Sequence, residues 1–224
     1  MNIRMIALLF AKDLFLSRRM ISAYLAGGIV AVALSFVPNE LVAFTGFILM
    51  LTAAIGLGIQ LITQLVLDER KNHNLSFVMS LPVTPIDYSI SKIAVVLSTY
   101  CIPWGVMFFG TVLLIYQLPS VPDGKLMTGT IIFLELFASF SLQLATAIIS
   151  ESMGWTIAVM VFGNVFFNLF IVGLMRNPEL AESMKSETVA WSPLMLQIIG
   201  CELAVIVLSI GLTVLLQTRK RDVV

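Results

Sequence analysis

The sequence predicts an all-α integral membrane protein with six transmembrane helices. Composition is the first observation behind this prediction: of the 224 residues, 59% are hydrophobic and only 12% are charged, whereas a soluble domain is usually about half apolar and a quarter charged. A soluble fold of this size still exposes much of its surface to water and cannot hide so many apolar side chains. The second observation is spacing, because six apolar stretches each reach roughly the 17 residues or more that a helix needs to cross a bilayer.

Breaks that contain proline or charged residues separate the six predicted spans. The spans are Ile21 to Val37, Leu41 to Leu67, Ser91 to Leu118, Leu126 to Ser150, Trp155 to Met175, and Leu194 to Gln217. We interpret residues 1–224 as a single transmembrane domain. Its parts outside the spans are an N-terminal segment, residues 1–20, a long loop, residues 68–90, and a second loop, residues 176–193.

Residues 1–20 carry too many charges to cross the bilayer. Their basic residues Arg4, Lys12, Arg18 and Arg19 fall within one arc of a helical wheel, although two apolar residues interrupt that arc. This partial amphipathicity favours an interfacial helix along the membrane surface. The alternative is that the segment is the N-terminal end of a long first helix.

The loop after the second span predicts two helix boundaries. Residues 72–81 are consistent with a short helix that is apolar on one side, and Pro82 ends it because proline lacks an amide donor. Thr84 is a suitable N-cap and Pro85 suits the first helical position. The third helix is therefore expected to run without interruption from Pro85 to about Leu118, which at 1.5 Å per residue is roughly 50 Å.

The distribution of basic residues predicts the orientation of the chain. If the N-terminus is cytoplasmic, ten lysines and arginines lie on the cytoplasmic side and three lie outside. Cytoplasmic enrichment of these residues sets membrane topology. We therefore expect a multi-pass protein of the bacterial inner (cytoplasmic) membrane, surrounded by lipid, with both termini in the cytoplasm. The 13 basic and 13 acidic residues balance, so net charge does not suggest nucleic acid as a partner.

The loop 68–90 resembles the first cytoplasmic loop of ABC-2 type transporter permeases. The family has an acidic-basic pair, an apolar position, a short apolar run ending in Leu-Pro-Val/Leu, and a lysine about ten residues later. In this chain the matching residues are Glu69-Arg70, Leu75, Ser80-Leu81-Pro82-Val83 and Lys92. The chain differs from the family at Asn72-His73-Asn74, where Gly-Thr is usual, and at Ser76, where Glu is common.

The resemblance implies that residues 72–81 form a coupling helix that docks in a cleft of a cytoplasmic ATPase. It also implies a complex of two permease subunits, identical or different, with two copies of that ATPase. The residues that the resemblance assigns to ATPase binding are Glu69, Arg70, Asn74, Leu75, Val78, Met79, Leu81 and Pro82. The sequence lacks the G-x-x-x-x-G-K-[ST] phosphate loop. We therefore expect no enzymatic activity and no bound cofactor in this chain, with ATP and Mg²⁺ held by the partner ATPase.

Polar residues within the predicted spans are the second group of candidates. Glu135 and Glu202 lie about eight or nine residues from the outer ends of the fourth and sixth spans. Charged groups at such depths are rare and often functional. Together with Gln143, Asn164 and Asn168 they predict a substrate path or a subunit interface. The alternative for the amides, which we favour, is hydrogen bonding between helices.

Three other functions remain open at this point. The midplane carboxylates are compatible with an ATP-independent secondary transporter or channel, although the halves of the chain lack matching broken helices. An anchoring subunit of a membrane complex is a further alternative. An intramembrane enzyme is the least favoured, because the single histidine, His73, lies outside the predicted spans and no H-E-x-x-H motif is present.

Overall fold

The computed structural model describes residues 3–71, 85–119, 121–189 and 191–219, and the regular elements in them are all helices. Six of these helices are long and apolar enough to cross a membrane. They are α1 Ile3–Ser35, α2 Glu40–Ile62 with its π-helical extension η1 Thr63–Leu67, α5 Pro85–Gln117, α6 Lys125–Ser150, α7 Met153–Arg176 and α9 Pro193–Arg219. The prediction of an all-α chain with six candidate spans is confirmed for the described residues.

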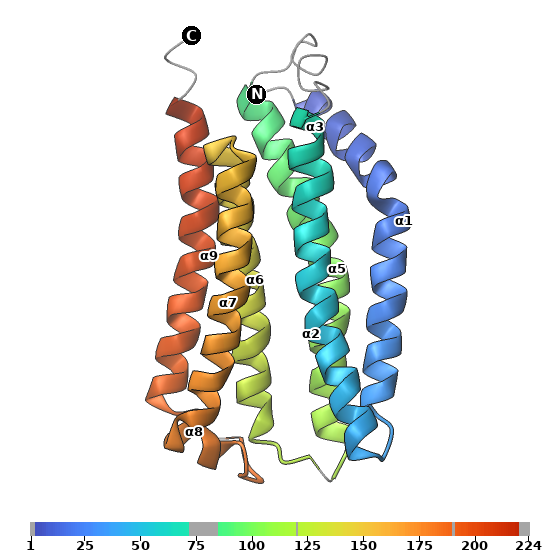
Figure 1. Cartoon of the computed structure of the whole chain (residues 1–224), viewed down its shortest axis with the longest axis vertical. Helices are drawn as coiled ribbons and strands as arrows, with labels where there is room; N and C mark the ends of the chain where they lie inside the picture. The colour runs from blue at the N-terminus through green and yellow to red at the C-terminus, as the bar shows by residue number, and fades with distance from the viewer. Residues whose placement is uncertain (1–2, 72–84, 120, 190, 220–224) are drawn as a thin grey trace.

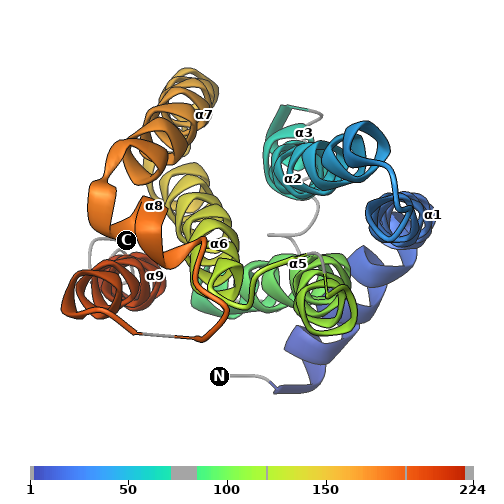
Figure 2. The same cartoon turned by 90° about the horizontal axis from the view of Figure 1, so that it is seen from below.

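The six long helices run along a common direction (Figure 1). The start of α1 and the end of α9 lie at one end of the bundle with the short helix α3, Asp68–Lys71, and we call this the α3 end. The short helix α8, Pro178–Ser183, lies at the opposite end, which we call the α8 end. Viewed along the bundle, α1, α2 and α5 form one group and α6, α7 and α9 form another (Figure 2). The two groups meet where α5 packs against α6.

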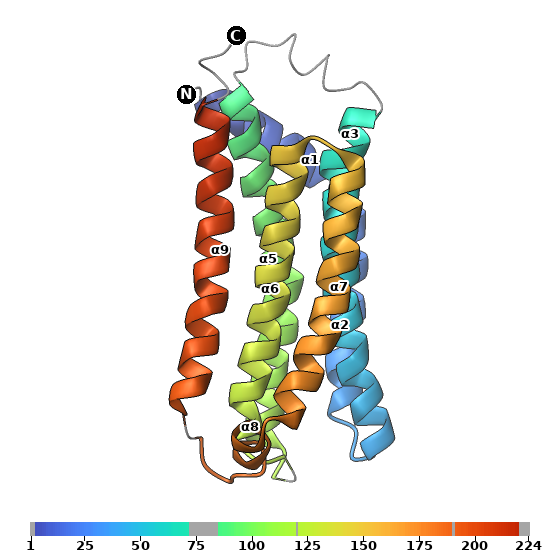
Figure 3. The same cartoon turned by 60° about the vertical axis from the view of Figure 1, so that its left-hand side comes forward.

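Helix α6 is the most buried of the six, whereas the outer faces of α7 and α9 are largely apolar and exposed. Exposed side chains such as Phe162, Leu169 and Val207 would be unfavourable in water and suit contact with lipid. In Figure 3, α9 and α7 flank the α5–α6 pair on opposite sides.

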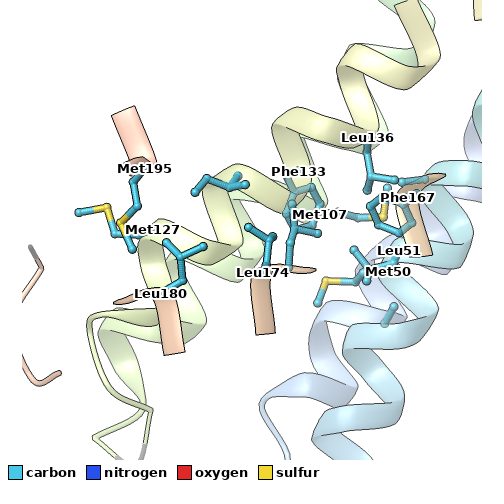
Figure 4. Packing of buried hydrophobic residues seen from close by; sticks show 14 residues of the cluster. Met50, Leu51, Met107, Met127, Phe133, Leu136, Phe167, Leu174, Leu180 and Met195 are labelled. Atoms are coloured by element: carbon cyan, nitrogen blue, oxygen red, sulfur yellow. The ribbon is translucent and has the colours of Figure 1, made fainter. Parts of the chain in front are cut away.

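Apolar side chains from both groups form the core at the α8 half of the bundle. Figure 4 shows Met127 of α6 beside Met195 of α9, with Leu180 of α8 close to both. Further along α6, Phe133 packs near Met107 of α5. The Nε1–H of Trp104 on α5 donates a hydrogen bond of 2.9 Å to the Phe133 carbonyl. This contact joins the two helix groups through α5 and α6.

Local capping residues account for several helix ends. The Asn39 side chain accepts hydrogen bonds from the amides of Leu41 and Val42 and caps α2. Helix α5 begins at Pro85 and ends at Gln117, as the sequence predicted to within one residue. Asn177 caps α8 in the same way as Asn39 caps α2.

Two features differ from the expected outline. Residues 3–20 continue into the first span without a break, so they form the first part of α1, which runs obliquely before it turns along the bundle (Figure 1). The favoured interfacial placement of this part stays a prediction. The second span ends in the π-helix η1, which the sequence did not reveal. Such π-helical segments are rare and often occur at functional sites.

Candidate functional site

A buried cluster of charged side chains lies at the α3 end, where α1, α3 and α5 meet. Its centre is Lys92, in the second turn of α5. The Lys92 Nζ lies 2.6 Å from Oδ2 of Asp13 on α1 and 2.6 Å from Oε2 of Glu69 on α3. The side chains of Lys92, Asp13 and Glu69 are only 4%, 2% and 10% exposed. Helices from distant parts of the chain therefore meet at one lysine.

A second lysine completes the charge balance of this cluster. Lys12 Nζ lies 2.8 Å from Glu69 Oε1 and 3.2 Å from Asp13 Oδ1, and its side chain is 41% exposed. Two cations thus face two carboxylates. Tyr88 on α5 donates a further hydrogen bond of 2.8 Å from its hydroxyl to Glu69 Oε2. The Glu69 carboxylate therefore has partners on both of its oxygens.

Burial and neighbouring charges have opposite effects on the pKa of the Glu69 carboxyl group. Burial alone raises the pKa of the Glu69 carboxyl, but the positive charge of Lys92 and hydrogen bonds from Lys12, Lys92 and Tyr88 outweigh it. The net result is a pKa below the usual 4.5. Glu69 is accordingly ionised at neutral pH and stays a strong partner for Lys92.

The cluster connects residues on both sides of positions 72–84. Glu69 lies just before residues 72–84, whereas Tyr88 and Lys92 lie just after them. The residues that flank the segment are therefore joined to each other and, through Asp13, to α1. Removing one member of a buried ion pair leaves an uncompensated charge, so the arrangement has a strong preference for one geometry.

The structure places only some of the residues assigned to ATPase binding. Glu69 lies in the cluster, so its carboxylate is engaged within the chain. Arg70 belongs to α3. The remaining six, Asn74, Leu75, Val78, Met79, Leu81 and Pro82, lie outside the described residues. The proposed coupling helix stays a prediction.

Two of the polar residues predicted inside the membrane line a small cavity between α2, α6 and α7. Gln143 and Asn164 share this cavity with Ser139 and Gly58, and its volume of about 20 Å³ suits roughly one water molecule. Asn168 is not part of its lining. The cavity is therefore polar on its α6–α7 side and much smaller than a transport path.

The amides make a different kind of contact from the one expected. Gln143 donates to Ser139, Asn164 to the Met160 carbonyl, and Asn168 to the Asn164 carbonyl. Each of these bonds lies within one helix, and the prediction that these three amides join helices stays a prediction. In each case the acceptor lies four residues earlier on the same helix, so the bond forms without a contact to another helix. Interhelical bonds do form elsewhere, from Tyr24 to Gln60 and from Gln217 to the Ile148 carbonyl.

Glu135 and Glu202 lie together in the α6–α9 contact, away from this cavity. Both are buried, at 8% and 4% exposure. Neither lines the Gln143–Asn164 cavity. The structure thus separates the expected set of five polar residues: Gln143 and Asn164 line the cavity, Glu135 and Glu202 are buried elsewhere on α6 and α9, and Asn168 belongs to neither place.

Lys12, Asp13 and Tyr88 were not identified as site residues from the sequence. The available signal was an aspartate and a lysine, Asp13 and Lys92, each placed near the same end of a predicted span. Their separation along the chain hid the pairing. Within the described part of the chain, no three His, Cys, Asp or Glu side chains are grouped as ligands for a metal ion.

No protein-family model, no curated protein and no solved structure matches this chain.

Proposed function

We propose that this chain is the membrane-spanning permease subunit of an ATP-binding cassette exporter. The observation that carries the proposal is the buried charge cluster around Lys92. It joins Glu69, which precedes residues 72–84, to Tyr88 and Lys92, which follow them, and Lys92 also pairs with Asp13 of α1. This is the segment that resembles a coupling loop. A rigid base of this kind suits a segment through which a partner protein moves the membrane helices.

In this proposal the motor is a separate chain. Residues 72–81 dock their apolar face, with Leu75, Val78 and Met79, into a cleft of a cytoplasmic ATPase, a common way for amphipathic helices to bind. Movement of the ATPase then reaches α5 and α1 together, because Lys92 and Asp13 are paired. Two ATPase copies and a second permease subunit complete the transporter. ATP and Mg²⁺ bind to the ATPase.

An ATP-independent transporter or channel is the second candidate. The observation in its favour is the pair Glu135 and Glu202, buried between α6 and α9. Buried acids in membrane helices are typical of ion and proton pathways. This candidate requires neither an ATPase nor a coupling helix, so the partner distinguishes it from the first.

The test is purification of the tagged full-length protein from its native membrane in mild detergent, followed by mass spectrometry of the chains that co-purify. We expect a P-loop ATPase in about equal amount. Leu75→Asp and Met79→Asp should lose it without loss of membrane insertion, because a charge cannot enter an apolar cleft without cost.

The matched controls are Leu75→Met and Met79→Leu, which keep the apolar character and should retain the ATPase. Recovery of the folded protein without an ATPase would contradict the proposal and favour the second candidate. Retention of the ATPase by both Asp variants would show that the partner docks elsewhere.

A further inference from the structure

The buried face of α9 is unusually polar for a membrane helix. Its buried residues follow a helical spacing of seven, seven, four and four, namely Met195, Glu202, Ser209, Thr213 and Gln217. Towards the α3 end these groups have partners: Gln217 donates to the Ile148 carbonyl of α6 over 3.2 Å, and Thr213 donates to the Ser209 carbonyl over 2.6 Å. This polar stripe packs mainly against α6.

Glu202 differs from the others in the stripe. Both of its carboxyl oxygens are buried, and neither has a hydrogen-bond partner among the described residues. Glu135 is buried on α6 at a similar depth, since Glu202 and Glu135 lie about 14 and 15 Å from the starts of their helices at the α8 end. An ionised carboxylate without a partner is far more costly to bury than a neutral acid.

Within the described residues, no counter-charge faces Glu202 from the neighbouring helices. The charged residues of the helices that pack on α6 or α9 lie in the first two turns or the last turn, apart from Glu135 and Glu202 themselves. They are Glu40 of α2, Asp87 and Lys92 of α5, Lys125 of α6, Arg176 of α7, Glu179 and Glu182 of the short α8, and Arg219 of α9. Helix α5 also carries four titratable groups without a charge. Tyr88 donates a hydrogen bond to Glu69, and Tyr100 stacks on Phe140. Cys101 and Tyr116 are exposed.

We propose that Glu202 is a proton-binding site within the α6–α9 contact. The carboxyl group carries its proton in the folded protein, and the proton comes from water on folding. The buried oxygens leave no exposed surface for a larger ion, and hard metal ions require several oxygen ligands. A proton needs neither an exposed surface nor several oxygen ligands. Glu135 reinforces the site, because two carboxylates buried on helices that pack together oppose each other when both are charged. This inference does not rest on the proposed permease function.

The site makes stability depend on pH in a defined direction. In the unfolded chain a glutamate is ionised above about pH 4.3, whereas the folded chain keeps the Glu202 proton. Folding then takes up a proton, so stability falls as pH rises. The ratio of folded to unfolded protein should decrease by up to tenfold for each pH unit in the neutral range through this one group.

The first test is infrared spectroscopy of the full-length protein in lipid vesicles at neutral pH. A protonated carboxyl group has a carbonyl band that is separate from those of carboxylates and amides. We expect the wild type to show this band and Glu202→Gln to lose it. Glu182→Gln removes an exposed acid of α8 and should leave the band unchanged. Absence of the band in the wild type would overturn the proposal.

The second test compares unfolding in detergent across the neutral pH range. Glu202→Gln imitates the neutral acid, so its stability should depend on pH less steeply than that of the wild type. The difference in slope should correspond to at most one proton taken up on folding. Equal pH dependence in both proteins would contradict the proposal. If Glu202→Gln does not fold, Glu202→Asp serves in its place, because it keeps the carboxyl group and should shift the infrared band rather than remove it.

Discussion

At the scale of single residues, the central feature is the neutral four-charge cluster of Lys12, Asp13, Glu69 and Lys92. Burial removes favourable hydration from each charge, and only the close opposite charges offset that loss. The cluster therefore contributes less net stability than its short distances suggest, but it strongly favours one relative position of α1, α3 and α5. Such a preference keeps α1, α3 and α5 in a fixed relative position.

Removing the central cation should be much more damaging than removing the outer one. Lys92→Met leaves two carboxylates with only Lys12 as counter-charge, so the free energy of unfolding should fall by about 3 kcal/mol or more. Lys12→Met is the matched control, and it should lower this free energy by about 1 kcal/mol or less because Lys12 is 41% exposed. Unfolding of both variants in detergent provides the measurement.

The double variant Asp13→Asn, Lys92→Met provides a further check. It removes one charge of each sign, so it should recover part of the stability that Lys92→Met loses. Equal losses for the Lys12 and Lys92 variants, or no recovery in the double variant, would show that the cluster is not the ionic connection described.

The pH dependence of stability should identify Glu69. Its pKa in the fold lies below 4.5, so the carboxylate stabilises the native state at pH values above its unfolded pKa. That stability is lost as pH falls through the lower folded pKa. Between about pH 6 and 3 the wild type should therefore lose more unfolding free energy than Glu69→Gln does. Parallel curves for the two proteins would contradict this role.

At the scale of the elements, glycine sets how closely two helices approach. A Cβ atom on Gly46 of α2 would lie 2.5 Å from Ser35 Oγ and 2.8 Å from the Ala31 carbonyl oxygen of α1. Backbone atoms of α1 cannot move aside as a side chain can. The close packing of α1 on α2 near their connecting turn therefore depends on the missing side chain. Small residues have this role in many membrane helix pairs.

Gly46→Ala should separate α1 from α2 and lower the thermal unfolding temperature. Gly27→Ala on α1 is the matched control, because a Cβ atom added to Gly27 would meet no neighbouring side chain or helix within 4 Å. That control should be neutral or stabilising, since alanine favours a helix by about 1 kcal/mol over glycine. Similar unfolding temperatures for the two variants would mean that the close approach is unimportant for stability.

At the scale of the whole molecule, six spans place the start of α1 and the end of α9 at the same end of the bundle. From the lysine and arginine distribution we expect that end to be cytoplasmic. The six long helices of the described residues are consistent with an even number of membrane crossings. The direction of insertion stays a prediction.

Single-cysteine labelling tests this orientation. In a background with Cys101 and Cys201 replaced by serine, Glu187→Cys after α8 should react with a membrane-impermeant maleimide on intact spheroplasts. Thr218→Cys at the end of α9 should react only after lysis. The side chains of Glu187 and Thr218 are both exposed, so access within the protein does not limit either reaction. The reverse labelling pattern would invert the topology and place residues 72–84 outside the cytoplasm.

The sequence by itself determined the elements that depend on local physics. Apolar length predicted the six long helices, and Pro85 predicted the start of α5, because proline fits the first helical turn and disrupts later ones. The depth of Glu135 and Glu202 also followed, since a helix converts residue number directly into distance along its axis.

Only the tertiary structure decided which of these elements meet, because contact between distant residues depends on how helices pack and not on their own periodicity. It joined Asp13 to Lys92 across 79 residues, and it separated Glu135 and Glu202 from the Gln143–Asn164 cavity. Apolar periodicity is weak in helices that face lipid on one side and protein on the other, since both faces are apolar. The lengths of the apolar stretches therefore predicted the long helices, whereas helix packing determined which residues pair with each buried charge.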